Sequence, residues 1–231
     1  MTGRGSGEPG EPPRRSLRIG LTGPIGCGKS TIGRWLVERG AALVDADEVA
    51  REVTAPATPT HEAVLAHFGP AVRGPDGTLD RRALGALVFA DPERLRELEA
   101  LVHPAVRPAL LGRVEAAERA GARVVAIEAI RLVESGLGAL CDEIWLVRCD
   151  PGEQRSRLLA RGASPADADR RIAAQAGLGE RLRAHATRVL DTSGPPAGAR
   201  ARAEATFDEA LAASRGRGPN GTRVHPPRTA R

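Results

Sequence analysis

LRIGLTGPIGCGKST, residues 17–31, joins an apolar segment to a glycine-rich turn and the start of a helix. The apolar part, from Leu17 to Leu21, predicts a buried strand, and the apolar spacing from Gly28 to Glu38 predicts a helix. The turn between them matches G-x-x-x-x-G-K-S, in which backbone N–H groups converge on phosphate oxygens at a helix N-terminus. The order strand, turn, helix therefore predicts a P-loop that holds the phosphates of a nucleoside triphosphate.

The candidate nucleotide-binding residues are the nine consecutive residues of this turn: Gly23, Pro24, Ile25, Gly26, Cys27, Gly28, Lys29, Ser30 and Thr31. We expect Lys29 to bridge the β- and γ-phosphates and the Ser30 hydroxyl to ligate Mg²⁺. Lys29 is also the only lysine among 34 Lys and Arg residues. A compact ammonium fits beneath two phosphates, whereas a planar guanidinium is too broad. The lone lysine thus argues against the alternative, a glycine-rich loop that binds nothing.

Composition indicates a single α/β domain. Of 231 residues, 41% are hydrophobic and 2% are aromatic, which predicts an aliphatic core. No stretch approaches the roughly 20 apolar residues of a membrane span, and the N-terminal segment lacks the apolar part of a signal peptide. Cys27, Cys141 and Cys149 match neither a disulfide framework nor a zinc spacing, so we expect a reduced, cytoplasmic protein.

Strands and helices alternate along the chain. Short apolar segments are expected to be strands: 17–21, 41–44, 123–127, 143–147 and 188–190. Helices are expected between and after them: 28–38, most of 48–120 with turns at 69–70 and 74–77, 151–159, 168–186 and 196–214. This alternation indicates a parallel sheet covered on both faces. The domain is expected to span 16–214, between disordered tails at 1–15 and 215–231.

Other classes of P-loop protein need other residues around the loop. A GTPase would read guanine with N-K-x-D, but the only asparagine is Asn220, so that class is excluded. Residues 191–194 match the D-x-x-G string of GTPases, but this is weak evidence because only two positions of the string are fixed. A motor-type ATPase needs an acidic residue at a strand end, and both Asp45 and Glu128 qualify, so that class stays open.

Asp45-Ala46-Asp47 follows the second expected strand, at the edge of the sheet where ligands bind. One carboxylate could orient magnesium-bound water while the other accepts a hydroxyl proton. The alternative for Asp47 is a helix N-cap before Glu48, a role compatible with catalysis. We favour catalysis for Asp47.

Arginines after the fourth expected strand form a second group of candidates. Most arginines of this chain are expected on solvated helix faces, but Arg155, Arg157 and Arg161 precede a turn-rich segment. A mobile lid there would bring arginines over the transferred phosphate. We favour Arg161 first and Arg155 second.

Longer stretches of the chain resemble the dephospho-CoA kinases, which phosphorylate the 3′-hydroxyl of dephospho-CoA with ATP. The matching stretches are LTGPIGCGKST, GAALVDADEVAREV, GTLDRRALGALVFADPERLRELEALVHP and EQRSRLLAR…RRIAAQ. They keep the family's order over about residues 17–195. The resemblance implies a three-layer P-loop kinase with a five-stranded parallel sheet, a helical CoA-binding region at about 48–121 and a lid at about 161–186.

The resemblance also implies roles for single residues. Asp47 would be the catalytic base for the 3′-hydroxyl, Lys29 and Ser30 would take the phosphate and magnesium roles, and Arg161 would neutralise charge during transfer. ATP and Mg²⁺ would be the cofactors, and the products would be coenzyme A and ADP, which is the last step of coenzyme A synthesis. The substrate-binding candidates are Asp45, Arg81, His103 and Arg155. For His103 we favour a structural role in the turn before Pro104.

The chain departs from the family pattern at several positions. Cys27 stands where serine is common, and its place beside a helix N-terminus suggests inhibition by oxidation, with a merely small residue as the alternative. The family's P-L-L-x-E segment appears here as Ile130 to Glu134, without its proline. This leaves open whether Glu128 or Glu134 takes the role of the family's glutamate. Arg161 is followed by Gly162 instead of the usual aspartate.

Two rival functions remain at this stage. One is a nucleoside or nucleotide kinase of the same fold. The other is an ATP-dependent switch or binding module whose basic tail, 215–231, contacts nucleic acid. We expect that tail to be a solubilising extension, and we expect a monomer with no membrane partner.

Overall fold

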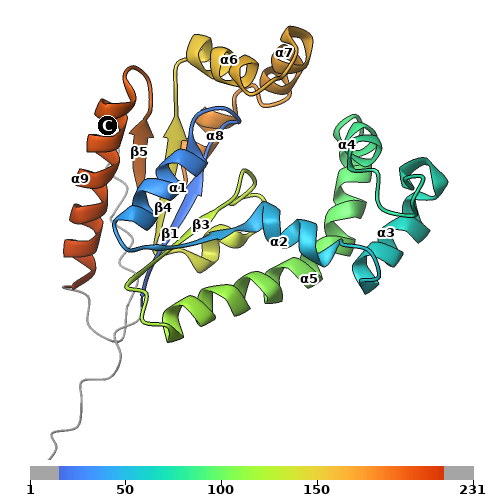
Figure 1. Cartoon of the computed structure of the whole chain (residues 1–231), viewed down its shortest axis with the longest axis horizontal. Helices are drawn as coiled ribbons and strands as arrows, with labels where there is room; N and C mark the ends of the chain where they lie inside the picture. The colour runs from blue at the N-terminus through green and yellow to red at the C-terminus, as the bar shows by residue number, and fades with distance from the viewer. Residues whose placement is uncertain (1–15, 216–231) are drawn as a thin grey trace, which may run out of the picture.

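The computed structural model describes residues 16–215. At its centre is one sheet of five parallel strands, β1 (Leu17–Thr22), β2 (Ala42–Asp45), β3 (Val124–Glu128), β4 (Glu143–Arg148) and β5 (Arg188–Asp191). The strand order is β2-β3-β1-β4-β5, with β1 in the middle (Figure 1). The predicted five-stranded parallel sheet is therefore confirmed, and each observed strand overlaps its expected range.

Parallel pairing brings the carboxyl ends of the strands to one edge of the sheet. In the register, Leu21 of β1 and Asp45 of β2 both lie beside Glu128 of β3. On the other side of β1, Thr22 lies beside Leu146 of β4. The loop that follows β1 thus begins between the ends of β3 and β4, and acidic residues stand next to it.

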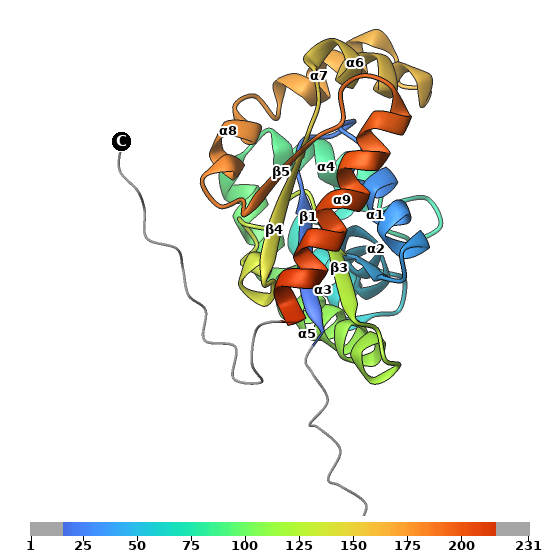
Figure 2. The ribbon, with the colours of Figure 1, turned by 90° about the vertical axis from the view of Figure 1, so that its left-hand side faces the viewer.

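Helices cover both faces of the sheet and make three layers. Helices α1 (Lys29–Glu38) and α9 (Pro196–Arg215) lie on one face; Figure 2 shows α9 in front of the strands and α1 beside it at the right. Their core contains Ile32, Leu36 and Phe207 packed on Trp145, whose indole N–H donates to Glu143 at 2.8 Å. Helix α5 (Pro92–Arg119) covers the other face through residues such as Leu110.

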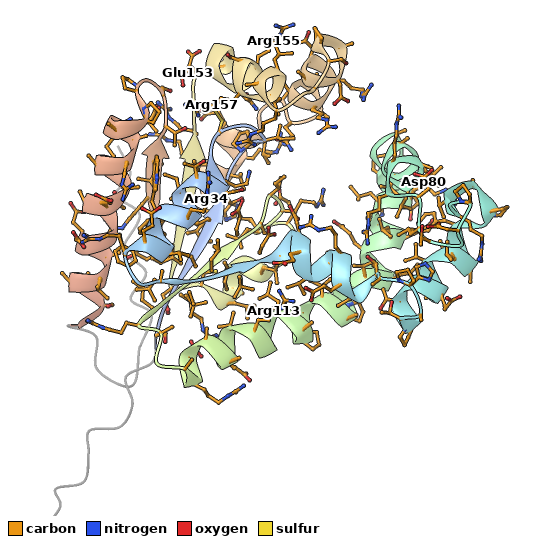
Figure 3. The ribbon with its side chains drawn as sticks, viewed as in Figure 1. Arg34, Asp80, Arg113, Glu153, Arg155 and Arg157 are labelled. Atoms are coloured by element: carbon orange, nitrogen blue, oxygen red, sulfur yellow. A yellow bond between two sulfur atoms is a disulfide. The ribbon has the colours of Figure 1, made fainter. Side chains whose placement is uncertain are left out.

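A helical region projects from the end of β2, at the right of Figure 1. It contains α2 (Ala46–Val53), α3 (Pro59–Phe68), the short 3₁₀ helix η1 (Pro70–Val72), α4 (Arg81–Phe89) and the first half of α5. Val64, Phe68 and Leu84 form part of a separate apolar core there. Arg113 of α5 pairs with Glu52, which joins α5 to α2 (Figure 3). The expected helical stretch and its turns are confirmed.

The expected helix over 168–186 is wrong. Two helices, α7 (Pro165–Ala173) and α8 (Leu178–Arg183), form there instead, whereas α6 (Pro151–Ala160) confirms the helix expected over 151–159. Gly177 precedes α8 with φ 70, a left-handed conformation that favours glycine and interrupts the α7 direction. Leu178 and Leu182 of α8 then pack on Leu146 of β4, so tertiary contacts stabilise the break. A further 3₁₀ helix, η2 (Leu137–Leu140), precedes β4.

The expectation of three reduced cysteines is also wrong, because Cys27 and Cys149 form a disulfide. They are 122 residues apart in sequence, with Cα atoms 5.1 Å apart. The reason lies in the strand order: β1 and β4 are neighbours, so the segments that follow them meet. Spacing along the chain carries no sign of such a contact.

The expected tail 1–15 lies outside the described residues, as does the tail 215–231 except for Arg215, which is the last residue of α9. Within residues 16–215, no helix is both long and apolar enough to cross a membrane.

Candidate active site

The loop between β1 and α1 has the conformation that its glycines predict. Gly28 precedes α1 with φ 91, and Gly23 has φ 142. A Cβ atom on Gly23 would lie 2.0 Å from the carbonyl oxygen of Val147, so no other residue fits there. The N–H groups at the start of α1 remain available to an anion. The geometry matches that expected of a phosphate-binding loop.

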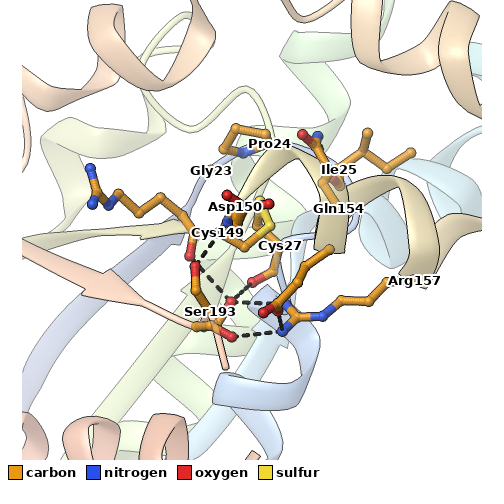
Figure 4. Close-up of a disulfide and its surroundings, with 12 residues drawn as sticks. Gly23, Pro24, Ile25, Cys27, Cys149, Asp150, Gln154, Arg157 and Ser193 are labelled. Carbon is orange, nitrogen blue, oxygen red and sulfur yellow. Dashed lines mark hydrogen bonds and ion pairs between the residues drawn. A yellow bond between two sulfur atoms is a disulfide. The ribbon is translucent and has the colours of Figure 1, made fainter. Parts of the chain in front are cut away.

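Distant segments hold this loop from three directions. The Gln154 side chain donates to the Ile25 carbonyl at 2.8 Å, and the Ile25 N–H donates to Gln175 at 2.7 Å. The Thr192 hydroxyl donates to the Cys27 carbonyl at 2.8 Å. Figure 4 shows Gln154 of α6 beside Ile25 of the loop. No role for these residues was predicted from the sequence. Gln154 and Gln175 lie in stretches quoted only for the family resemblance, and Thr192 lies in the weak D-x-x-G match.

Lys29 is buried in the loop, with 7% of its surface exposed. Its ammonium donates to the carbonyl oxygens of Gly23 at 2.9 Å and Pro24 at 3.2 Å. Burial lowers the pKa of Lys29, while the nearby carboxylates of Glu128 and Asp47 oppose that effect. The loop thus carries a positive charge whose position is set by its own backbone.

Glu128, at the end of β3, lies directly against the loop. The Ser30 hydroxyl donates to it at 2.6 Å. Burial raises the pKa of Glu128, and the Ser30 hydrogen bond and Lys29 partly offset this. Glu134, by contrast, is exposed in the turn that follows β3. The structure therefore places Glu128, and not Glu134, at the site.

Asp45 and Asp47 take different positions at the start of α2. The Asp45 carboxylate caps this helix by accepting from the N–H groups of Asp47 at 2.8 Å and Glu48 at 3.1 Å. The interpretation that placed the cap at Asp47 is therefore corrected. Among residues 16–215, no hydrogen bond reaches the Asp47 carboxylate. Partial removal from water raises its pKa, and the negative charge of Asp45 adds to that, while Lys29 lowers it.

The three candidate arginines of α6 have separate surroundings. Arg155 donates to Asp169 of α7 at 2.6 Å, an ion pair that joins the two helices (Figure 3). Arg157 donates to the Thr192 hydroxyl at 3.0 Å. Arg161 ends α6 and makes no ion pair within the described part of the chain. We call residues 151–173, which carry these side chains, the α6–α7 arm.

A cavity of about 680 Å³ separates this arm from the helical region. Four arginines line it, together with Ile25 of the loop: Arg82, Arg161, Arg170 and Arg171. A phosphorylated molecule suits this charge because guanidinium groups bind phosphate strongly. Of the three α6 candidates, the structure brings only Arg161 to this cavity.

Arg81 and His103 lie in the helical region, away from the loop. Arg81 begins α4, and its guanidinium donates to the Arg51 carbonyl at 3.1 Å and the Thr54 hydroxyl at 3.0 Å, both at the end of α2. His103 lies half-buried within α5, and this helix continues through Pro104, so the turn expected there is wrong. Substrate contacts of Arg81, His103 and Arg155 stay predictions.

The oxygen donors at the loop suit Mg²⁺. This ion is usually bound through one or two carboxylates together with nucleotide phosphates and water. The Ser30 hydroxyl and the Glu128 carboxylate are adjacent donors of that kind. Within residues 16–215, no group of three or more His, Cys, Asp or Glu side chains forms a metal site by itself. A bound Mg²⁺ would therefore depend largely on the nucleotide.

Comparison with known families decides what this site belongs to. The sequence model of the dephospho-CoA kinases matches residues 17–196. The chain belongs to the dephospho-CoA kinase family. A dephospho-CoA kinase of Symbiobacterium thermophilum is 45% identical over 208 residues, which cover 90% of this chain and 87% of that protein. One from Streptomyces avermitilis is 48% identical over 180 residues, covering 78% and 86%.

Solved structures agree with the fold. A crystal structure of a Thermus thermophilus protein has a TM-score of 0.70 at 37% identity, covering 85% of this chain and 98% of that one. Dephospho-CoA kinase from Campylobacter jejuni has a TM-score of 0.61 at 22% identity, with the same coverage, and supports the fold. The predicted family and fold class are confirmed.

Proposed function

We propose that this chain transfers the γ-phosphoryl group of ATP to the 3′-hydroxyl of dephospho-CoA, forming coenzyme A and ADP. Family membership supports the substrate. The observation that carries the chemistry is that three groups lie together at one edge of the sheet. They are an ammonium held by the loop, a hydroxyl bonded to a carboxylate, and a carboxylate that accepts no hydrogen bond within residues 16–215. These belong to Lys29, to Ser30 with Glu128, and to Asp47.

The residues divide the work of phosphoryl transfer between them. Lys29 and the N-terminus of α1 would hold the triphosphate and neutralise charge on its terminal groups. Arg161 would approach the same phosphates from the α6–α7 arm. Because phosphoryl transfer needs little covalent help from the protein, positioning and charge stabilisation supply most of the rate.

Asp47 would accept the proton of the attacking hydroxyl. Its carboxylate is free of hydrogen bonds within the described residues, and its raised pKa makes it a stronger base than an ordinary aspartate. Asp45 supports it indirectly, because its side chain holds the start of α2. We assign Asp45 a positioning role and not a direct contact with the substrate.

Mg²⁺, when bound, would neutralise the charge of the β- and γ-phosphates. Ser30 would present its hydroxyl to the ion, and Glu128 would accept from Ser30 or from a water on the ion. The helical region α2–α5 and the cavity with four arginines would hold the acceptor and its phosphates. The lid expected at about 161–186, which includes α7 of the arm, is part of this proposal. A cytoplasmic location and a monomeric state stay predictions.

A substrate panel tests the proposal. ADP release is measured with dephospho-CoA, nucleosides and nucleoside monophosphates as acceptors, with and without Mg²⁺, and phosphorus NMR locates the new phosphate. We expect ADP release with dephospho-CoA alone, dependent on Mg²⁺, with the phosphate on the 3′-oxygen. Faster turnover of a nucleoside or nucleotide would favour the rival kinase function instead.

A further inference from the structure

The disulfide joins two segments of the site that have no covalent link nearby. Cys27 belongs to the phosphate-binding loop, and Cys149 lies between β4 and α6. Figure 4 shows the bond beneath the start of α6. Cys141, the third cysteine, lies in the core on the opposite face of the sheet, packed near Leu132. The disulfide therefore links the loop to the segment just before the α6–α7 arm.

Solvent reaches this bond from one side. A cavity of about 350 Å³ is lined by both cysteines, with Pro24, Arg148 and Arg183 among its other residues. Cys27 is 1% exposed, whereas Cys149 is only partly buried. A small thiol or disulfide reagent that enters the cavity would meet the Cys149 sulfur first. The cavity wall carries both signs of charge, with Arg148 and Arg183 facing three carboxylates, Asp150, Glu180 and Asp191, so charge alone selects no reagent.

The local structure favours the thiolate form of Cys149, the thiol that solvent reaches. Cys27 lies just before the N-terminus of α1, and Cys149 lies just before that of α6. The positive end of a helix stabilises a nearby thiolate. Each helix has 10 residues, which is long enough to have such a positive end. Cys149, which solvent reaches, thus lies where exchange is favoured, and its Cα separation of 5.1 Å from Cys27 is within the range that a disulfide bridges.

The bond changes how the loop is connected to the arm. Without it, the contacts from this region to the loop are hydrogen bonds, such as Gln154 to Ile25 and Thr192 to Cys27, which can break and reform. With it, the loop and Cys149, two residues before α6, stay at one separation. Since Arg161 lies at the far end of α6, movement of the arm relative to the loop is restricted.

We propose that Cys27 and Cys149 are a redox modification site at which a low-molecular-weight disulfide oxidises the dithiol and slows the kinase. The Cys149 thiolate attacks the reagent disulfide, which leaves a mixed disulfide on Cys149 and releases one small thiolate. The Cys27 thiolate then attacks the Cys149 sulfur, which forms the internal bond and releases the second small thiolate. The protein dithiol loses two electrons, the reagent gains them, and excess small dithiol reverses both steps.

Oxidation should affect turnover more than nucleotide affinity. The Cys27 side chain lies in the core beside Ile32 and Trp145, away from the backbone N–H groups that face the phosphates. Bond formation therefore leaves those N–H groups in place, while the arm loses freedom. This kinetic part rests on the proposed function; the formation of the bond does not.

The test uses the full chain as wild type, Cys149→Ser and Cys141→Ala. Each is equilibrated with oxidised glutathione or with dithiothreitol, and alkylation followed by peptide mass spectrometry maps the thiols. ATP binding, turnover and the melting temperature are then measured. We expect a reversible Cys27–Cys149 bond and a kcat roughly 10- to 100-fold lower after oxidation, the scale that misplaced reacting groups produce. ATP affinity should change little, and the melting temperature should not fall.

The variants separate this site from general oxidation damage. Cys149→Ser should keep its reduced turnover in oxidised glutathione, whereas Cys141→Ala should behave as the wild type. Absence of the bond, or a bond that leaves kcat unchanged, would overturn the proposal. If the reduced protein does not phosphorylate dephospho-CoA, the proposed function fails. In that case, disulfide mapping and ATP hydrolysis without an acceptor still test the redox site by itself.

Discussion

Lys29 in the loop and Arg161 in the α6–α7 arm are both cations expected at the transferred phosphate, but the structure holds them differently. Lys29 is buried, and carbonyl oxygens of its own loop hold the ammonium. Arg161 is exposed at the end of a helix and borders a cavity. A charge held in place before the substrate binds costs no rearrangement during reaction, whereas an exposed charge must be brought to the phosphate. The loop should therefore contribute more to catalysis than the arm.

Replacement of the loop cation should have the largest effect. Lys29→Ala should lower kcat/KM for ATP by about 1,000-fold, because a preorganised charge at the phosphates is lost. Lys29→Arg keeps the charge and is the matched control. It should be almost as inactive, because a guanidinium does not fit the buried position. Steady-state ADP release measures both, and an active Lys29→Arg enzyme would show that charge alone suffices.

Asp47→Asn should have the second largest effect. Its kcat should be lower by about 100-fold or more, which is the usual contribution of a general base. ATP binding should be unchanged, because Lys29 and the loop N–H groups are intact. Nucleotide binding by calorimetry, compared with turnover, separates these two steps. Near-normal turnover of Asp47→Asn would show that another group accepts the proton.

Within the arm, Arg161 and Arg155 form a matched pair on one helix. Arg161→Ala should lower kcat by about 10- to 100-fold, in line with the loss of one stabilising group. Arg155→Ala removes an exposed ion pair with Asp169, and such pairs contribute little because solvent screens them, so activity should change little. Equal losses in the two variants would mean that arm stability matters, and not the charge at the cavity.

The smallest expected effect is a shift in the pH profile. Asp47 must be ionised to act as base, so kcat/KM should rise with pH, and its raised pKa places this rise above the ordinary aspartate range. Asp45→Asn removes the neighbouring negative charge, which lowers the Asp47 pKa and moves the rise to lower pH. Asparagine still caps α2, so the helix should be retained. An unmoved profile would mean that a different group controls this limb.

Much of the site could be predicted from short segments of sequence. The strand, the glycine-rich turn and the helix lie within residues 17–38, and their hydrogen bonds join near neighbours. Lys29 and Ser30 were identified for that reason, and the Asp45–Asp47 pair was found at the end of its strand. The helix break at Gly177 was missed, because packing of α8 on β4 stabilises it.

Local sequence by itself determined the loop, the alternation of strands and helices, and the family. Only the tertiary structure decided that Glu128 and not Glu134 faces Ser30, that Arg155 pairs with Asp169, and that Cys27 meets Cys149. The physical reason is the range of the contacts. A turn or a cap depends on residues a few positions apart, whereas side chains 122 residues apart meet only because β4 pairs with β1.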